Sequence, residues 1–187
     1  MQAYARAQGV PLAGNDGKTG ETLLRTTLAP MFRARNLEVL SWSGFNILGN
    51  RDGAVLDEPE ANAAKTGGKD KVLSAILGPG LGSSLTRIDY VPSLRDWKTA
   101  WDHVHFAGFL GTPMTLQFTW QGADSALAAP LVLDLARLAE LAQRRGLAGA
   151  QAPLACFFKQ PLGSEEHDFA RQMQAFAAYV QGPLSSR

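Results

Sequence analysis

The sequence predicts an α+β fold, with a mixed, largely antiparallel sheet and helices packed on one of its faces. Two runs of alternating apolar and polar residues, 101–106 and 114–120, flank the turn residues LGTP and predict a β-hairpin. A helical periodicity then extends over 126–145, starts just after the capping residues Asp124 and Ser125, and ends before a glycine.

The other elements can be assigned in chain order. Apolar residues recur every three or four positions over 22–36 and predict a helix, which Pro30 should kink or loosen. Acidic residues ahead of an apolar periodicity predict a last helix over 165–180. The remaining predictions are a helix end at 2–8, a strand at 37–42, a loop at 44–53, a short helix at 69–77, a loop at 78–84, a strand at 85–91, and a strand or extended segment at 155–159.

Composition and charge exclude several classes of protein. The chain has 187 residues, 45% of them hydrophobic and 19% charged, which suits an ordinary globular protein. Its formal net charge of +1 argues against a nucleic-acid partner and gives no reason to expect a membrane partner. The most apolar run, 126–139, is shorter than a bilayer span and contains Asp134. The single cysteine, Cys156, allows no internal disulfide, so we expect a reducing, cytoplasmic setting.

A glycine-rich stretch near the N-terminus, GNDGKTGET at 14–22, is typical of a phosphate-binding turn. A nucleotide-binding P-loop would need its first glycine at position 12, where Leu12 stands. The stretch still leads into a helix, whose first N–H groups and dipole attract a phosphate. On local grounds, the alternative is that Thr19 is an ordinary N-cap and the glycines only make a turn.

Six short motifs, in order and with compatible spacing, resemble the inositol-phosphate synthase family of bacterial type. Any one of them is weak, whereas six in register over roughly residues 12–163 are specific. The motifs are GNDGKTGET (14–22), N-x-L-G-N-x-D-G (46–53), the paired lysines Lys65 and Lys69, RDWK (95–98), ADS followed by AAPLVLDL (123–135), and FKQPL (158–162).

The resemblance implies an isomerase of inositol biosynthesis that converts glucose 6-phosphate to inositol phosphate with NAD as cofactor. In this family NAD oxidises the substrate at C5, enolisation and an intramolecular aldol closure join C6 to C1, and NADH reduces the ring ketone. The resemblance also implies a homo-oligomer, a tetramer built by sheet-to-sheet contacts. No metal site is predicted, because His103 and His105 share one face of a predicted strand without a third ligand nearby.

The resemblance also assigns roles to residues of these motifs. Lysines beside the reacting carbons can stabilise an enolate or move a proton, and burial or crowding by other cations lowers their pKa. The implied catalytic residues are Lys65, Lys159, Asp16 and Asp96. The implied phosphate-binding residues are Thr19, Gly20, Glu21, Thr22, Lys69 and Lys98. The implied cofactor-binding residues are Asp124, Ser125, Asn46, Asn50 and Asp52.

Local patterns offer an ordinary explanation for each of these residues. A lysine in a loop is usually a solvated surface charge. Asp52 with Gly53 is a common turn pair, and Asp124 with Ser125 is a common helix cap.

The chain also departs from the family pattern. Eukaryotic members have glutamine where Glu21 stands and histidine where Ile47 stands, and the charge of Glu21 would oppose a phosphate if it pointed inward. No glycine-rich dinucleotide fingerprint opens a βαβ unit in this sequence, although the family has one in an N-terminal Rossmann portion.

The sequence therefore predicts the catalytic and oligomer-forming part of such an enzyme. The expected divisions are the tail of a missing dinucleotide-binding domain at 1–13, a catalytic domain at 14–163, and a C-terminal helix at 164–187 that packs back on the missing domain. We expect this chain alone to be inactive. The alternatives are a non-catalytic module that oligomerises or binds a sugar phosphate and, third, a P-loop phosphotransferase dependent on Lys18.

Overall fold

The computed structural model describes residues 1–56 and 71–183, and the chain divides into two compact units. One unit comprises residues 20–127, and the other combines residues 1–19 with the chain from 128 onward. Lys65, Lys69 and the start of the helix predicted at 69–77 lie outside the described residues.

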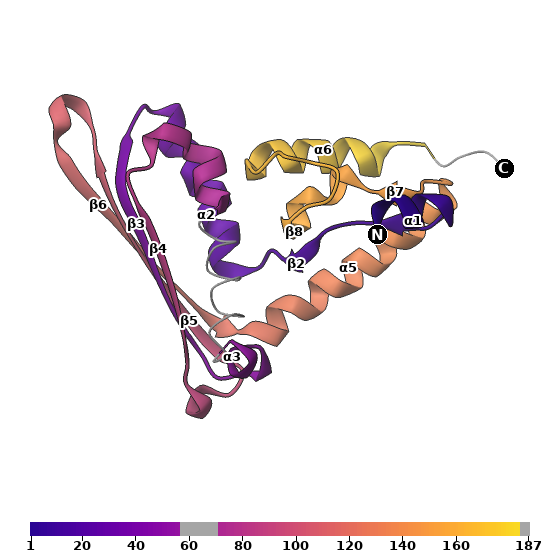
Figure 1. Ribbon diagram of the computed structural model, residues 1–187, viewed down its shortest axis with the longest axis horizontal. Helices are drawn as coiled ribbons and strands as arrows, with labels where there is room; N and C mark the ends of the chain where they lie inside the picture. Colours follow the sequence, from indigo (N-terminus) through magenta and orange to yellow (C-terminus); the bar gives the residue numbers. More distant parts are fainter. Residues whose placement is uncertain (57–70, 184–187) are drawn as a thin grey trace. The chain divides into compact units, whose positions relative to one another are not determined.

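The unit 20–127 is built on a four-stranded sheet with strand order β4-β3-β5-β6. The strands are β3 (Glu38–Leu48), β4 (Ser84–Tyr90), β5 (Trp97–Ala107) and β6 (Pro113–Ala123). β3 pairs parallel with β4 and antiparallel with β5, and β5 pairs antiparallel with β6. The predicted mixed, largely antiparallel sheet is therefore confirmed, as is the hairpin of β5 and β6 (Figure 1).

Helices lie along one face of this sheet (Figure 1). α2 (Gly20–Ala34) and the helical residues 71–77 bury apolar side chains against β3 and β5. Phe32 of α2 meets Trp42 and Phe106 edge-on, with ring centroids 5.9 Å and 4.9 Å apart. The short elements that connect the strands are α3 (Arg51–Val55), η1 (Gly78–Gly80), η2 (Pro92–Leu94) and η3 (Phe109–Gly111).

The pleat of β5 sorts its side chains onto two faces. Asp102 and Val104 are fully buried beneath the helices, and Lys98 lies on this inner face further along the strand. Trp97 and Trp101 lie on the outer face and are 48% and 36% exposed. The ring of Phe45 from β3 joins them there, 5.7 Å from that of Trp101.

The other unit contains shorter pairs of strands. β2 pairs antiparallel with β8, and β1 pairs parallel with β7. α5 (Asp124–Arg144) contributes its first turn to unit 20–127 and the rest to this unit. The further elements of this unit are α1 (Gln2–Ala7), β1 (Pro11–Leu12), β2 (Asn15–Gly17), β7 (Gly149–Ala150), η4 (Ala152–Phe157), β8 (Phe158–Gln160) and α6 (Phe169–Gln181).

Several predicted boundaries were wrong, including the start of the long helix, which begins at Asp124. The loop predicted at 44–53 begins only after Leu48, because β3 continues through Gly44. The last helix begins at Phe169 instead of 165, since the Asp168 carboxylate accepts hydrogen bonds from the first N–H groups of α6. In the stretch 155–159, η4 occupies the first part, and only the end belongs to strand β8.

None of the helices in the described part of the chain is both long enough and apolar enough to cross a bilayer.

Candidate functional site

Asp16 and Lys159, which stand 143 residues apart in the sequence, form an ion pair. Antiparallel pairing of β2 with β8 sets them opposite each other, and Lys159 Nζ lies 2.9 Å from Asp16 Oδ1. The two strands approach closely at Gly14, where a Cβ would lie 2.5 Å from the ring of Phe158. The structure thus joins two of the residues expected to be catalytic, and the Lys159 side chain is only 12% exposed.

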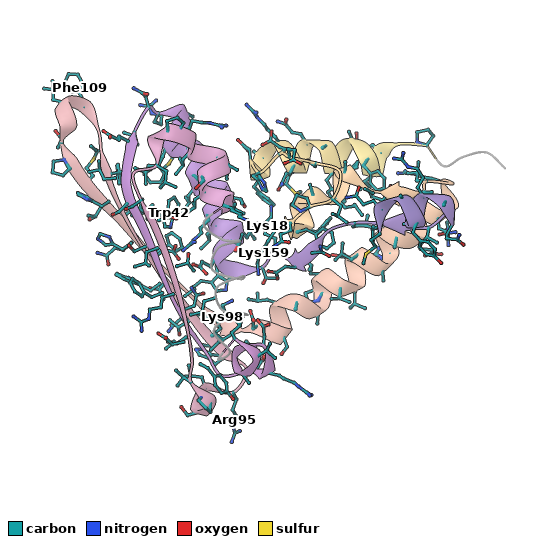
Figure 2. The ribbon with its side chains drawn as sticks, in the orientation of Figure 1. Lys18, Trp42, Arg95, Lys98, Phe109 and Lys159 are labelled. Carbon is teal, nitrogen blue, oxygen red and sulfur yellow. The ribbon has the colours of Figure 1, made fainter. Side chains whose placement is uncertain are left out.

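Lys18, the other lysine of this turn, points into its own unit. Its ammonium donates a hydrogen bond to Gln172 Oε1 at 2.5 Å and lies 5.7 Å from the ring centroid of Phe169. Burial lowers the pKa of Lys18 to about 8, against a smaller opposing effect of the neighbouring Cys156. A buried lysine held by glutamine is not the solvent-facing lysine that a P-loop presents to a nucleotide. Figure 2 marks Lys18 and Lys159 on this unit.

The turn ends where α2 begins. Gly20 opens this helix with φ of +51°, a left-handed conformation that favours glycine. Glu21 follows, and its carboxylate lies 2.7 Å from Arg25 Nη2 with both side chains buried. The charge of Glu21 is therefore directed to Arg25, which leaves the backbone N–H groups of this first turn as the phosphate-attracting feature.

Arg25 holds a buried polar cluster between α2 and the sheet. Its guanidinium lies 2.9 Å from Asp102 Oδ1, and its Nη1 donates to the hydroxyl of Thr86 at 3.0 Å. The indole of Trp42 donates to the same Asp102 oxygen at 2.7 Å. Burial raises the pKa of the Asp102 carboxyl, and Arg25 opposes that rise. A Cβ on Gly44 would lie 1.8 Å from Arg25 Nη2, so only glycine leaves room for the guanidinium there.

Lys98, Asp124 and Asn50 form a second polar cluster in unit 20–127. Lys98 Nζ lies 3.6 Å from Asp124 Oδ1, and the two side chains are 18% and 20% exposed. Asn50 donates from Nδ2 to Asp124 Oδ2 at 3.4 Å, while its Oδ1 caps α3 by accepting from the N–H of Gly53. Lys98 lies toward the same end of the sheet as Arg95, away from Phe109 at the hairpin tip (Figure 2).

Asp96 and Ser125 form a neighbouring pair. Both carboxylate oxygens of Asp96 lie 3.3 Å from the N–H of Ser125, and one also accepts from the Ser125 hydroxyl. This carboxylate therefore caps the N-terminus of α5, which begins at Asp124. Asp124 and Ser125 themselves lie inside the helix.

The two other residues implied to contact NAD lie on or after β3. Asn46 is 1% exposed on the inner face, and its side-chain amide donates to the carbonyl of Arg87 at 3.5 Å. Asp52 lies in the first turn of α3 and is exposed.

The structure thus places seven of the predicted residues in three groups of side chains. These are Asp16 with Lys159, Lys98 with Asp124 and Asn50, and Asp96 with Ser125. The phosphate-binding role of Lys98 and the catalytic role of Lys159 stay predictions. The phosphate-binding roles of Thr19, Gly20, Glu21 and Thr22 also stay predictions.

Apart from Glu21, the residues of the cluster around Arg25 were absent from the predicted site residues. The four-residue spacing of Glu21 and Arg25 indicates a helical ion pair, but such pairs are usually exposed. Asp102 and Thr86 come from two separate strands, and no local sequence pattern predicts that both contact Arg25.

Within the described residues, no group of three or more His, Cys, Asp or Glu side chains is placed to hold a metal ion.

The comparisons with known proteins specify the family to which this fold belongs. The sequence profile of the myo-inositol-1-phosphate synthase family matches residues 20–125, more than half of the chain. The chain belongs to this family.

Two relatives are similar over most of the chain. Inositol-3-phosphate synthase 1 of Bacteroides thetaiotaomicron is 41% identical over 179 residues, covering 92% of this chain and 41% of the relative. Inositol-3-phosphate synthase of Trypanosoma brucei brucei is 31% identical over 172 residues, covering 87% of this chain and 33% of the relative. The chain thus spans less than half the length of the curated relatives it matches.

Solved structures agree with the fold. Inositol-3-phosphate synthase of Caenorhabditis elegans has a TM-score of 0.85 and 26% identity, over 94% of this chain and 39% of that chain. A myo-inositol-1-phosphate synthase-related protein of Thermotoga maritima also has a TM-score of 0.85, with 24% identity over 98% of this chain and 49% of its own. The second likeness bears on the fold alone.

Proposed function

We propose that this chain supplies the substrate-handling part of an inositol-3-phosphate synthase. The reaction is the NAD-dependent cyclisation of glucose 6-phosphate to inositol phosphate, by oxidation, enolisation, aldol closure and reduction. It would take place in the cytoplasm. The observation that carries the proposal is the ion pair of Asp16 with Lys159, which joins two motifs of this family from opposite ends of the chain.

The ion pair suits an acid–base role. A carboxylate at 2.9 Å orients the ammonium of Lys159, and the low exposure of Lys159 limits competition from water. Lys159 would hold or release the proton that moves during enolisation, and its charge would stabilise the enolate oxygen. Lys65 would act beside it, and Asp96 would act by fixing the start of α5.

The phosphate would be held by the turn from Thr19 to Thr22 together with Lys69 and Lys98. Glu21 contributes its N–H and not its carboxylate, because the carboxylate is bound by Arg25. The substitution of glutamine by glutamate at this position is therefore compatible with an anion at the start of α2.

NAD, when bound, supplies the hydride acceptor for oxidation at C5. The side chains of Asn50 and Asp124 fit a polar ligand of this kind, because the amide and the carboxylate lie together and Asp124 is partly exposed. Ser125, Asn46 and Asp52 are the other residues that we propose on this side.

The dinucleotide fingerprint would come from a further portion of the enzyme, on which the C-terminal helix would pack. In support, α5 and α6 border a cavity of about 580 Å³ within their own unit. Its apolar lining comprises Leu138, Leu141, Phe157, Met173, Phe176 and Val180. A Leu141→Glu change should weaken binding of a separately expressed dinucleotide-binding portion, measured by titration calorimetry.

We further propose a homo-oligomer, a tetramer, formed through the outer face of the four-stranded sheet. Phe45, Ile47, Leu85, Trp97 and Trp101 leave 36–53% of their surface exposed on that face. Light scattering on the purified chain tests this: Trp101→Glu should lower the molar mass, and an unchanged mass would reject this interface.

A chimera tests the enzymatic proposal. The chain replaces the matching segment of the Bacteroides thetaiotaomicron synthase, and conversion of glucose 6-phosphate to inositol phosphate is measured with NAD. We expect activity in the chimera, a loss of roughly 100- to 10,000-fold with Lys159→Ala, and little change with the control Lys71→Ala, an exposed lysine. The 187 residues alone should show little or no turnover.

The same experiment separates the alternative. A folded chimera that binds glucose 6-phosphate without converting it would indicate a non-catalytic sugar-phosphate-binding module. Robust turnover by Lys159→Ala would contradict the assigned role of Lys159.

A further inference from the structure

Trp120, on the edge strand β6, has a buried nitrogen without a hydrogen-bond partner in the described part of the chain. An indole N–H is a donor only, and leaving one buried and unpaired costs free energy. The indole of Trp42, on the same face, shows the ordinary solution, because it donates to Asp102 at 2.7 Å. The Trp120 nitrogen therefore calls for an acceptor that this part of the chain does not provide.

The Trp120 nitrogen faces the start of α2. Sheet register aligns Asn46, Ala100 and Trp120 in one row across β3, β5 and β6. A Cβ added to Gly20 would lie 3.2 Å from Trp120 Nε1 and 3.4 Å from its Cδ1. The N–H edge of the indole thus lies against the first residue of a 15-residue helix, where backbone N–H groups have no helical acceptor.

A second buried polar group without a partner lies in the same helical turn. Thr22 is 1% exposed, and its hydroxyl has no hydrogen-bond partner among the described residues. Two independent side chains, one from the helix and one from the sheet, are therefore left unsatisfied at the same helix end.

The surrounding groups favour an anionic acceptor over a neutral one. Lys98 lies on the same face of β5 as Ala100, two residues away, or about 7 Å along the strand. Of the nearby carboxylates, Glu21 and Asp102 pair with Arg25, and Asp124 pairs with Lys98. What remains at the start of α2 is a set of donors with a positive helix end.

We propose that the indole N–H of Trp120 donates a hydrogen bond to a phosphate oxygen of the substrate at the start of α2, with Thr22 as a further partner. Trp120 is then a specificity-determining residue for a phosphomonoester, and none of the motif assignments includes it. This inference rests on the proposed function, because it takes the sugar phosphate to be the ligand of this turn.

NMR of the indole N–H groups tests the proposal in the intact 187-residue chain. The four tryptophans give four indole signals, and Trp120→Phe identifies the one from Trp120. Glucose 6-phosphate and, separately, inorganic phosphate are titrated, with glucose as the uncharged control. We expect both anions to shift the Trp120 signal, glucose to leave it in place, and the Trp42 signal to stay unchanged.

Affinity provides the second readout. Trp120→Phe keeps the aromatic ring and removes the donor, so glucose 6-phosphate should bind about 10- to 100-fold more weakly, as for loss of a hydrogen bond to a charged group. Trp101→Phe, the same change on the outer face of β5, is the matched control and should bind normally.

The outcomes separate this inference from the proposed function. If glucose 6-phosphate binds but the Trp120 signal does not move and Trp120→Phe binds normally, the inference is wrong and the phosphate site stands. If glucose 6-phosphate and glucose both move the Trp120 signal while inorganic phosphate does not, the donor contacts the sugar and the inference is again wrong. If neither anion binds, both the inference and the proposed phosphate site are wrong.

Discussion

The guanidinium of Arg25 lies 2.9 Å from the carboxylate of Asp102, and both side chains are completely buried. The pair joins α2 to β5 beneath the start of the proposed phosphate-binding helix. Glu21 shares the same guanidinium, so one buried cation faces two buried carboxylates. Removing the cation would take the Arg25 charge away from both carboxylates.

Arg25→Met should therefore destabilise the protein strongly. Breaking a buried ion pair by removal of one partner costs about 3–5 kcal/mol, because the remaining charge stays buried. Denaturant unfolding at neutral pH measures the loss. Arg137→Met is the control, since Arg137 pairs with Asp134 on the exposed surface of α5 and should change stability little. A similar small effect for both variants would show that the Arg25 cluster does not hold α2 in place.

Lys18 should make stability depend on pH in the alkaline range. Its folded pKa of about 8 lies below the ordinary value of 10.5, so the unfolded chain binds more protons between these values. Stability from this group therefore rises as pH increases through that window. Between about pH 7 and about pH 9, the free energy of unfolding of the wild type should rise by on the order of 1 kcal/mol relative to that of Lys18→Met.

Unfolding curves of both proteins at the two pH values check this expectation. Cys156 is present in both, so its own raised pKa, which lowers stability as pH rises above 9.0, largely cancels in the comparison. If the difference in free energy of unfolding between wild type and variant is the same at both pH values, the lowered pKa of Lys18 is contradicted.

Arg95→Gly should stabilise the protein. Arg95 has φ of 54° and ψ of −122°, a backbone conformation that costs a side-chain-bearing residue about 1–3 kcal/mol. Glycine removes this strain, but its larger loss of chain entropy on folding costs roughly 0.5–1 kcal/mol. A net increase near 1 kcal/mol in the free energy of unfolding is therefore expected. Asn36→Gly is the control, because asparagine tolerates its positive φ of 50°. Thermal unfolding measures both, and a lowered midpoint for Arg95→Gly would mean that its side chain contributes more than the strain costs.

Asp96→Ala should loosen the start of α5. Loss of a cap costs about 0.5–2 kcal/mol, and amide hydrogen exchange should increase first at Ser125 and the residues after it. A double-mutant cycle with Ser125→Ala measures the coupling, which should be clearly non-zero because the two side chains are hydrogen-bonded. Additive effects would show that Asp96 does not act through Ser125.

The sequence predicted the fold class and most elements because the hydrophobic periodicity of the long helix and of the hairpin is strong. It failed at Gly44, where a glycine suggested a loop. Gly44 lies within β3, and this strand has a glycine there because the Arg25 guanidinium occupies the space that a side chain would need. Such a contact joins residues far apart in the sequence, so no local pattern could predict it.

The candidate site was predictable only in part for the same reason. The motifs identified Asp16 and Lys159 separately, and strand pairing brings them together. They could not show where the Glu21 carboxylate points, since that depends on Arg25 and, through it, on Asp102. The motifs did not include Trp120, because the lack of a partner for its nitrogen among the described residues is visible only once the neighbours are placed.

Side chains of β5 alternate between the two faces of the sheet, so the number of residues in this strand decides which side chains face inward. Lys98 and Asp102 share the inner face, while Trp97 and Trp101 share the outer one. Deleting Ala100 would exchange the inner and outer positions of β5 after that point, because the side-chain period is two. Asp102 would leave Arg25, and Trp101 would turn inward. A single-residue deletion in β5 therefore moves several side chains to the opposite face, whereas a substitution changes only one.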